Sequence, residues 1–278
     1  ASRDPLRSAA GGLRGAQDTG TRGTATPHTT GAAILSQPSA GAAVIETWER
    51  RHLQDKAGTA PPVYFTRDCE ELYLLGHRKS GIYVIRPEGS PYLVVQCYMY
   101  DCGGWTVIQR NSYDTDITWS ETWTAYQHGF GNIELDHYLG NRFINLLTAQ
   151  KLNRVSFVLA DSENRTWHAD YDSIYLTNQT DKFRLRLGTY EGDAGDAMSS
   201  ATYKNLHDNM RFSTFDDDND RLYNTNCANE HGGGWWFDSC YDAHLNNRGR
   251  LHWKALCDHN CRSSLILIRP VHMYCNRV

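Results

Sequence analysis

One short segment of the sequence gathers side chains that could hold a metal ion. Four carboxylates fall within five residues, in the run Asp216-Asp217-Asp218-Asn219-Asp220. Carboxylates at this density repel one another unless a cation neutralises them, and oxygen donors are the ligands that Ca²⁺ prefers. The run is not an EF-hand, because a loop starting at Asp216 would have Arg221 at position six and Cys227 at position twelve, where Gly and Glu are required. We expect a calcium loop of another kind; a solvated acidic turn is the alternative.

A second pattern could indicate catalysis. His231-Gly232-Gly233-Gly234 is similar to the HGGG oxyanion-hole motif of esterases, but the chain contains no G-x-S-x-G nucleophile elbow. It also lacks the phosphate-binding G-x-x-x-x-G-K motif and the H-E-x-x-H metal motif. We therefore expect no enzymatic activity. Six other histidines show no metal-ligand spacing and are assigned no function: His128, His137, His168, His207, His244 and His272.

The cysteines and two sequons indicate a secreted glycoprotein. Eight cysteines, an even number, are typical of disulfide-bonded proteins in an oxidising compartment. N-glycosylation sequons begin at Asn164 and Asn178. The first residue is Ala, and residues 1–13 lack the basic start and apolar stretch of a leader, so we expect a processed chain.

Composition argues against nucleic acid and membrane partners. The 278 residues have a formal charge of −4, which gives no long-range attraction to nucleic acid or anionic lipid. The longest apolar runs, such as 264–268, are far shorter than the roughly 20 residues that span a bilayer. We expect neither nucleic-acid binding nor membrane insertion.

Residues 1–60 differ in composition from the rest of the chain. No aromatic residue precedes Trp48, and Gly, Ala, Ser and Thr dominate, so we expect a flexible tail. The tail has no Gly-X-Y repeat, and a possible short helix at 44–56 spans less than two heptads. Without a collagen stalk or long coiled coil, we expect a monomer or small oligomer.

The folded part, residues 61–278, reads mostly as strands. Apolar residues alternate with polar ones over 155–159 and 183–187, which predicts half-buried strands. Residues 92–98 and 265–268 predict strands buried on both faces. One helix is predicted, with Asp136 as its N-cap and with an apolar face formed by Leu139, Phe143, Leu146 and Leu147. The class is α+β.

Several motifs together resemble a known family. The run Cys102-Gly103-Gly104-Trp105-Thr106-Val107-Ile108-Gln109-Arg110 is similar to the GGWTVxQR signature of fibrinogen-like C-terminal domains. Further matches follow in the family's order: Gly129-Phe130-Gly131-Asn132, Leu139-Gly140-Asn141, Gly195-Asp196, Phe212-Ser213-Thr214-Phe215-Asp216, Asn226-Cys227-Ala228, Gly234-Trp235-Trp236-Phe237, Leu245-Asn246 and Ile268-Arg269-Pro270. The resemblance covers residues 67–270 and leaves out the tail.

The resemblance implies a fold of three subdomains with a central, mainly antiparallel sheet and a loop-rich calcium and ligand subdomain. It also implies a recognition protein without catalysis. For the calcium site, it implies side-chain ligands from Asp218 and Asp220 and backbone carbonyl ligands from Leu222 and Asn224. Trp235, Trp236 and Phe237 are expected to be core residues.

The resemblance also implies two disulfides, Cys69–Cys97 and Cys227–Cys240. The other four cysteines allow three connectivities, of which we favour Cys257–Cys261 with Cys102–Cys275. A zinc site is the alternative, because His252 and His259 flank Cys257 and Cys261.

By the same resemblance, the residues lining a ligand pocket are Glu230, His231, Ser239, Cys240 and Tyr241, with a cis peptide bond before Cys240. The chain departs from relatives that bind acetyl groups or fibrin knobs: Tyr241 replaces their His, and the stretch between Asn246 and Trp253 is short. We therefore expect an extracellular protein receptor or glycan as partner. The alternatives are a lectin of innate immunity that recognises acetylated or acidic glycans, and a structural matrix protein without a small-ligand pocket.

Overall fold

The computed structural model describes residues 65–271, and its largest feature is a ten-stranded sheet. The expected tail, the possible helix at 44–56 and Cys275 lie outside these residues. Along its main path the sheet contains, in spatial order, β1 (Gly81–Ile85), β2 (Leu93–Tyr100), β3 (Gly103–Ser112), β13 (Ser263–Pro270), β6 (Asn153–Ala160), β7 (Thr166–Leu176) and β8 (Leu185–Leu187). Each neighbouring pair on this path is antiparallel, as predicted.

Shorter elements surround this sheet. β4 (Phe130–Gly131) pairs with β5 (His137–Tyr138), β5 pairs with β3, and β9 (Tyr190–Gly192) pairs with β7. A second sheet has three strands, β10 (Ala243–His244), β11 (Leu251–Trp253) and β12 (Cys257–Cys261). The helices are α2 (Cys69–Leu74), α3 (Trp123–His128), α4 (Asn141–Gln150), α5 (Cys227–His231) and the 3₁₀ turn η1 (Gln179–Asp181).

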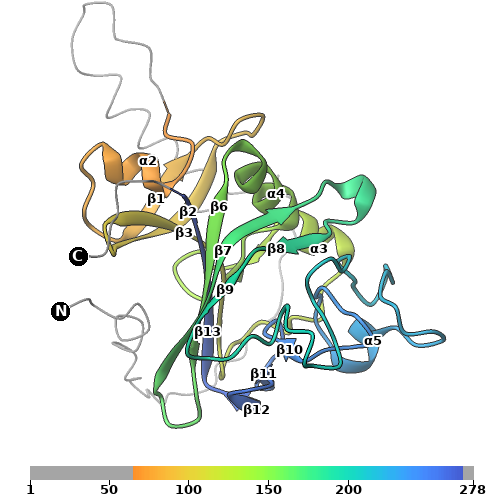
Figure 1. Ribbon diagram of the computed structural model, residues 1–278. Coiled ribbons are helices and arrows are strands. Elements are labelled where there is room, and N and C mark those ends of the chain that lie inside the picture. The colour runs from red at the N-terminus through yellow and green to blue at the C-terminus, as the bar shows by residue number, and fades with distance from the viewer. Residues whose placement is uncertain (1–64, 272–278) are drawn as a thin grey trace, which may run out of the picture. The chain divides into compact units, whose positions relative to one another are not determined.

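These elements form three regions, as the predicted fold requires. Figure 1 shows α2 and β1 at one end of the large sheet, and α5 with β10–β12 at the other. The three aromatic residues from Trp235 to Phe237 are buried in the core of the second end, as predicted. No helix among residues 65–271 is long and apolar enough to cross a bilayer.

β13 lies in the middle of the large sheet, and both of its faces are buried, as predicted. Leu265 and Leu267 belong to a small apolar cluster on one face, while Ile266 and Ile268 belong to the main core on the other. The neighbouring β6 was expected to be half-buried, but Arg154 is its only residue that is not buried. The reason is its central position between β13 and β7, where Phe157 packs in the main core on one face and Val158 packs in the small apolar cluster on the other.

The prediction for residues 92–98 is wrong in the opposite sense, because β2 is only partly buried. β2 is paired on one side with the edge strand β1, so it lies near the margin of the sheet. The strand predicted over 183–187 begins later than expected. β8 begins at Leu185 because Lys182 and Phe183 have positive φ angles of 57° and 48°, which extended strands do not adopt.

The predicted helix exists, but Asp136 is not its N-cap. The helix, α4, begins after Gly140, which has a φ of 106° that disfavours other residues. The Asp136 carboxylate instead accepts hydrogen bonds from the backbone N (3.1 Å) and Oγ (2.5 Å) of Ser112. Ile144 and Leu147 are buried where α4 packs against β7.

The glycine pair in the motif at 103–104 allows α2 to approach β3 closely. A Cβ atom on Gly104 would lie 1.9 Å from the carbonyl oxygen of Cys69. The Gly104 amide donates a hydrogen bond of 2.7 Å to the buried Glu70 side chain. A side chain at this position would therefore force helix and strand apart.

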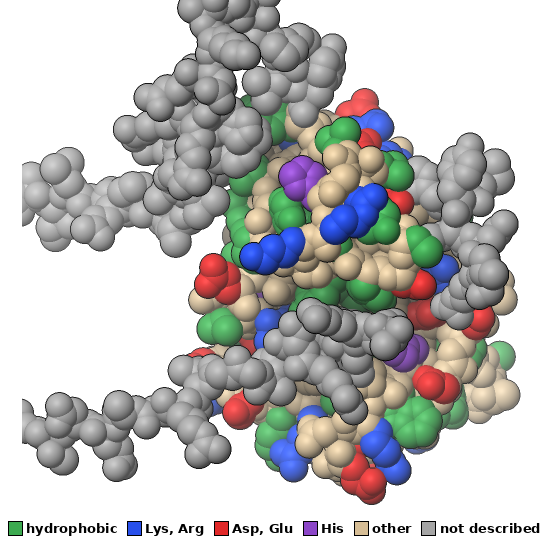
Figure 2. Space-filling model, turned by 90° about the vertical axis from the view of Figure 1, so that its left-hand side faces the viewer, with side chains coloured by type: hydrophobic (Ala, Val, Ile, Leu, Met, Phe, Trp, Pro, Cys, Tyr) green, Lys and Arg blue, Asp and Glu red, His purple; other side chains and the backbone are tan. Residues whose placement is uncertain are grey.

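The surface agrees with the mild net charge. Figure 2 shows Lys and Arg side chains interspersed with Asp and Glu on one face of the described part. Such mixing does not produce the one-sided basic field that binds nucleic acid.

Candidate functional site

The acidic run at 216–220 contains two carboxylates that the protein itself satisfies. Asp217 forms an ion pair with Lys182, with an Nζ to Oδ2 distance of 2.6 Å. Asp216 accepts hydrogen bonds from the Thr214 hydroxyl (2.7 Å) and the Trp123 amide (2.8 Å). These two acidic residues shape the loop and connect it to α3.

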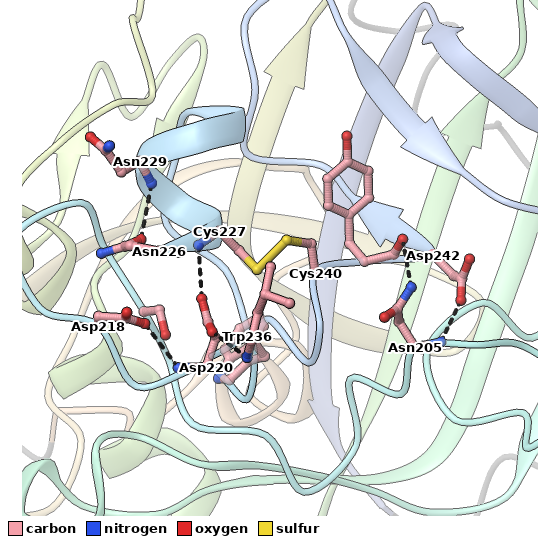
Figure 3. The surroundings of a disulfide bond; sticks show 12 residues. Asn205, Asp218, Asp220, Asn226, Cys227, Asn229, Trp236, Cys240 and Asp242 are labelled. Atoms are coloured by element: carbon pink, nitrogen blue, oxygen red, sulfur yellow. Dashed lines mark hydrogen bonds between the residues drawn. A yellow bond between two sulfur atoms is a disulfide. The ribbon is translucent and has the colours of Figure 1, made fainter. Parts of the chain in front are cut away.

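The other two carboxylates, those of Asp218 and Asp220, take part in none of the ion pairs found among the described residues. Asp220 accepts a hydrogen bond of 2.8 Å from each of the Leu222 and Cys227 amides, and its own amide lies 3.2 Å from Asp218 Oδ1. Figure 3 shows the Asp220 side chain directed at the Cys227 amide, with Asp218 beside it. Burial and the negative charge of Asp218 raise the pKa of Asp220, although the two amides oppose this.

This arrangement fits a hard cation. Neither carboxylate pairs with a cationic side chain among the described residues, and carboxylate oxygens are ligands that Ca²⁺ prefers. Within the described part, the backbone carbonyls of Leu222 and Asn224 accept no hydrogen bond from another residue. The two predicted carbonyl ligands are therefore free to bind an ion, with Asn224 held in a turn at a φ of 70°. The carboxylate oxygens of Asp218 and Asp220 that accept amide hydrogen bonds each keep a further lone pair for a cation.

A disulfide and an ion pair connect the acidic loop to the segment that contains the predicted ligand residues. The first is the Cys227–Cys240 disulfide, whose Cys227 amide binds Asp220. The second is an ion pair of 2.6 Å between Arg221 Nε and the buried Asp238 carboxylate. Arg221 holds the pKa of Asp238 below its usual value, against the opposing effect of burial. The loop and the segment before Cys240 are thus fixed to each other.

The predicted ligand residues lie around this disulfide. Glu230 and His231 are exposed at the end of α5, and Ser239 is exposed beside the half-buried Cys240. The ring centroids of His231 and Tyr241 lie 4.9 Å apart, edge to face. The cis bond expected before Cys240 is absent, since every peptide bond between described residues is trans.

The sequence did not indicate two residues that hold the backbone next to the predicted ligand residues, His207 and Asn205. His207 is fully buried; its Nδ1 lies 2.8 Å from the Trp236 carbonyl, and its Nε2 accepts hydrogen bonds from the amides of Asp242 (3.2 Å) and Ala243 (3.0 Å). Nδ1 must therefore be the protonated nitrogen of a neutral ring. Burial lowers the pKa of His207 to about 4.

Asn205 supports the same segment. Its amide donates to Asp242 Oδ2 (2.6 Å) and its side chain to the Tyr241 carbonyl (3.2 Å), as Figure 3 shows. Neither Asn205 nor His207 has a local sequence signal, because their partners are more than 25 residues away in the chain.

Residues 65–271 contain three disulfides, Cys69–Cys97, Cys227–Cys240 and Cys257–Cys261, which are three of the predicted pairs. Since the sulfurs of the third pair are joined, they are not available as thiolate ligands for the zinc alternative. The fourth predicted pair, Cys102–Cys275, involves a residue outside the described part.

Both predicted glycosylation sites are exposed. Asn164 lies in the turn between β6 and β7 at a φ of 61°. Asn178 precedes η1, and its Oδ1 accepts a hydrogen bond of 2.6 Å from Thr180. Glycan occupancy at either site stays a prediction.

Comparison with known proteins identifies relatives of this arrangement. The chain is 41% identical over 215 residues to fibrinogen-like protein 1-like protein of Gallus gallus, covering 76% of this chain and 75% of the relative. It is 39% identical over 188 residues to fibrinogen-like protein 1 of Bos taurus, covering 64% of this chain and 60% of that protein. It spans only 42% of human fibroleukin, to which it is 39% identical.

Solved structures share the fold. The fibrinogen-like globe domain of human ANGPTL6 superposes with a TM-score of 0.70 at 33% identity, over 78% of this chain and 100% of that one. Lamprey fibrin D-dimer complexed with the peptide Gly-His-Arg-Pro-amide superposes with a TM-score of 0.69 at 26% identity, over 86% of each chain. The sequence profile described as fibrinogen beta and gamma chains, C-terminal globular domain, matches residues 65–262. This chain therefore belongs to the family of fibrinogen C-terminal globular domains.

Proposed function

We propose that this chain is a secreted, non-enzymatic recognition protein that binds an extracellular protein through a surface held in place by a calcium-bound loop. The surface consists of Glu230, His231, Ser239, Cys240 and Tyr241 and is called the recognition surface below. The observation that carries the proposal is the contact of Asp220 with the Cys227 amide, because it joins the calcium loop directly to the disulfide of that surface.

Secretion is supported by the chemistry of the cysteines. Three disulfides occur in residues 65–271, and such bonds form and persist in oxidising compartments. The exposed sequons at Asn164 and Asn178 agree with passage through the secretory pathway.

Calcium is proposed to act as a structural clamp. Bound between the carboxylates of Asp218 and Asp220, it would remove their mutual repulsion and fix the turn that ends at Cys227. The Arg221–Asp238 ion pair transmits the same constraint to the residue before Ser239. Loss of calcium should therefore loosen both ends of the recognition surface.

A protein partner is favoured over a glycan for three reasons. The stretch between Asn246 and Trp253, from which relatives build the aromatic wall of an acetyl pocket, is short in this chain. The lamprey fibrin structure shows that a related domain accepts a short peptide. In addition, the edge-to-face rings of His231 and Tyr241 give an amphipathic patch of the kind that protein interfaces favour.

The test compares labelled chain on intact cells with the same chain on a glycan array, each with calcium and with EDTA. We expect saturable cell binding that EDTA and prior trypsin treatment of the cells abolish. Tyr241→Ala should weaken this binding at least tenfold, as expected for an interface anchor worth about 1.4 kcal/mol or more. The control is Tyr175→Ala, at an exposed tyrosine on β7 outside the recognition surface.

Each alternative gives a different result. EDTA-sensitive binding to the array, with cell binding that survives trypsin, would establish the lectin alternative and refute a protein partner. Binding to neither cells nor the array would favour the structural matrix alternative. Equal losses in Tyr241→Ala and Tyr175→Ala would show that the recognition surface is placed wrongly.

A further inference from the structure

A second group of metal-binding side chains lies on the small sheet, separate from the acidic loop. His252 is on β11, and Asp258 and His259 are on β12. The oxygen Oδ1 of Asp258 is 3.2 Å from Nδ1 of His252 and 3.4 Å from Nε2 of His259. One ligand atom from each residue lies within 4.8 Å of the other two, so the three side chains converge on one point.

The two distances from Asp258 Oδ1 match the spacing that a tetrahedral zinc ion requires. Zinc bonds to nitrogen and carboxylate oxygen of about 2.0–2.2 Å place neighbouring ligand atoms roughly 3.3–3.5 Å apart. Two imidazole nitrogens and one carboxylate oxygen form a donor set that suits zinc and disfavours Ca²⁺, which prefers oxygen ligands alone.

His252 provides an independent indication of a ligand. Its side chain is only 8% exposed, and its Nδ1 makes no hydrogen bond, although Asp258 lies near it. A buried ring nitrogen without a partner is costly unless something else binds it.

The backbone around these residues is held in place. The Cys257–Cys261 disulfide closes the short segment that contains Asp258 and His259, and His259 has a φ of 61° there. β12 pairs with β11 on both sides of this segment, through Leu251 with Cys261 and Trp253 with Cys257. The three ligands therefore come from a closed hairpin, which limits the rearrangement that metal binding would need.

We propose that His252, Asp258 and His259 bind one zinc ion, with a fourth position open to water. The site borders the recognition surface, because the ring of Tyr241 lies 5.5 Å from that of His252 and 6.1 Å from that of His259. Zinc here is a second ion, distinct in place and chemistry from the calcium of the acidic loop.

The experiment measures zinc binding to the full chain by equilibrium dialysis with metal analysis, without reductant, so that the cysteines stay oxidised. The chain is loaded with calcium beforehand. Two variants remove ligands: Asp258→Asn, at a side chain that is 86% exposed, and His259→Gln on the same hairpin. The controls are Asp114→Asn and His128→Gln, two exposed residues outside the site.

We expect one zinc per chain at micromolar zinc. Each ligand variant should weaken zinc affinity by more than about 100-fold. Loss of a residue that only orients a metal ligand already lowers metal affinity by about 10–100-fold. Cobalt in place of zinc should give the visible absorption bands of a tetrahedral site, and both ligand variants should lose them. The control variants should bind zinc as the original chain does.

Two results would overturn the proposal: no zinc bound at micromolar concentrations, or undiminished binding by both Asp258→Asn and His259→Gln. The calcium proposal is tested separately by Asp218→Ala, which should lose calcium-dependent stabilisation and keep zinc binding. A failure of one metal site is therefore distinguishable from a failure of the other.

Discussion

Acidification should destabilise this domain through buried histidines, of which His207 is the clearest. The pKa of His207 is lowered to about 4 in the folded chain, whereas an unfolded histidine titrates near 6.5. As the pH falls through 6.5, His207 becomes protonated in the unfolded chain but stays neutral in the folded chain. The contribution of neutral His207 to the free energy of unfolding is therefore fully present above pH 6.5 and is lost as the pH falls toward 4.

The size of the effect follows from the two pKa values. Between pH 7 and pH 5, one histidine shifted from 6.5 to 4 removes about 2 kcal/mol from the free energy of unfolding. His137 is also buried, and its pKa is likewise lowered to about 4, so the two together remove about 4 kcal/mol. This is a large part of the roughly 5–15 kcal/mol that stabilises a typical domain.

The assay is urea unfolding at pH 7, 6 and 5 in EDTA, followed by tryptophan fluorescence. His207→Gln keeps an acceptor for the Asp242 and Ala243 amides but cannot titrate, so its loss between pH 7 and pH 5 should be about 2 kcal/mol smaller. His128→Gln, at an exposed histidine, should match the original chain. If His207→Gln lost as much stability as the original chain, the assignment of a buried neutral His207 would be refuted.

Three further predictions follow from the site and the core. Calcium at 100 times its dissociation constant should stabilise the chain by about 2.7 kcal/mol in thermal unfolding, and Asp218→Ala or Asp220→Ala should abolish this gain. Arg221→Ala should lower the free energy of urea unfolding by about 1–2 kcal/mol, since it removes an ion pair to the buried Asp238 carboxylate. Gly104→Ala should lower it by about 3 kcal/mol or more, because the new Cβ would meet a backbone carbonyl of α2 at 1.9 Å. The first prediction fails if the calcium shift persists in both variants, the second if Arg221→Ala is neutral, and the third if Gly104→Ala unfolds like the original chain.

The order of motifs was enough to predict the fold, whereas local patterns predicted burial correctly for β13 but not for β2 or β6. The run at 155–159 alternates as a half-buried strand does, yet β6 is buried on both faces. One face packs in the main core and the other packs in the small apolar cluster, which includes residues of β13 more than 100 positions later in the chain. The alternation at 183 fails because the backbone turns there, with a positive φ at Phe183. Neither fact is visible in hydrophobic spacing, which reports side chains and not their neighbours in space.

The same limit applies to the site. The acidic run is contiguous in sequence, and the family resemblance implies the Cys227–Cys240 disulfide, so both could be predicted. His207 and the Arg221–Asp238 pair depend on contacts between residues distant in the chain. The sequence did indicate His252 and His259 as alternative zinc ligands, but together with the neighbouring cysteines. The signal that was missed is Asp258, which sequence alone does not orient toward either histidine.

The position of β13 has a consequence for how the molecule is made. This strand is the last of those described in chain order, yet it separates β3 from β6, pairing Leu265 with both Arg110 and Val158. During synthesis, β3 and β6 each have an unpaired edge until residues 263–270 leave the ribosome. Unpaired strand edges promote aggregation. The sheet can therefore be completed only after residues 263–270 have been made, and a premature stop before Ser263 would leave β3 and β6 without the strand that joins them.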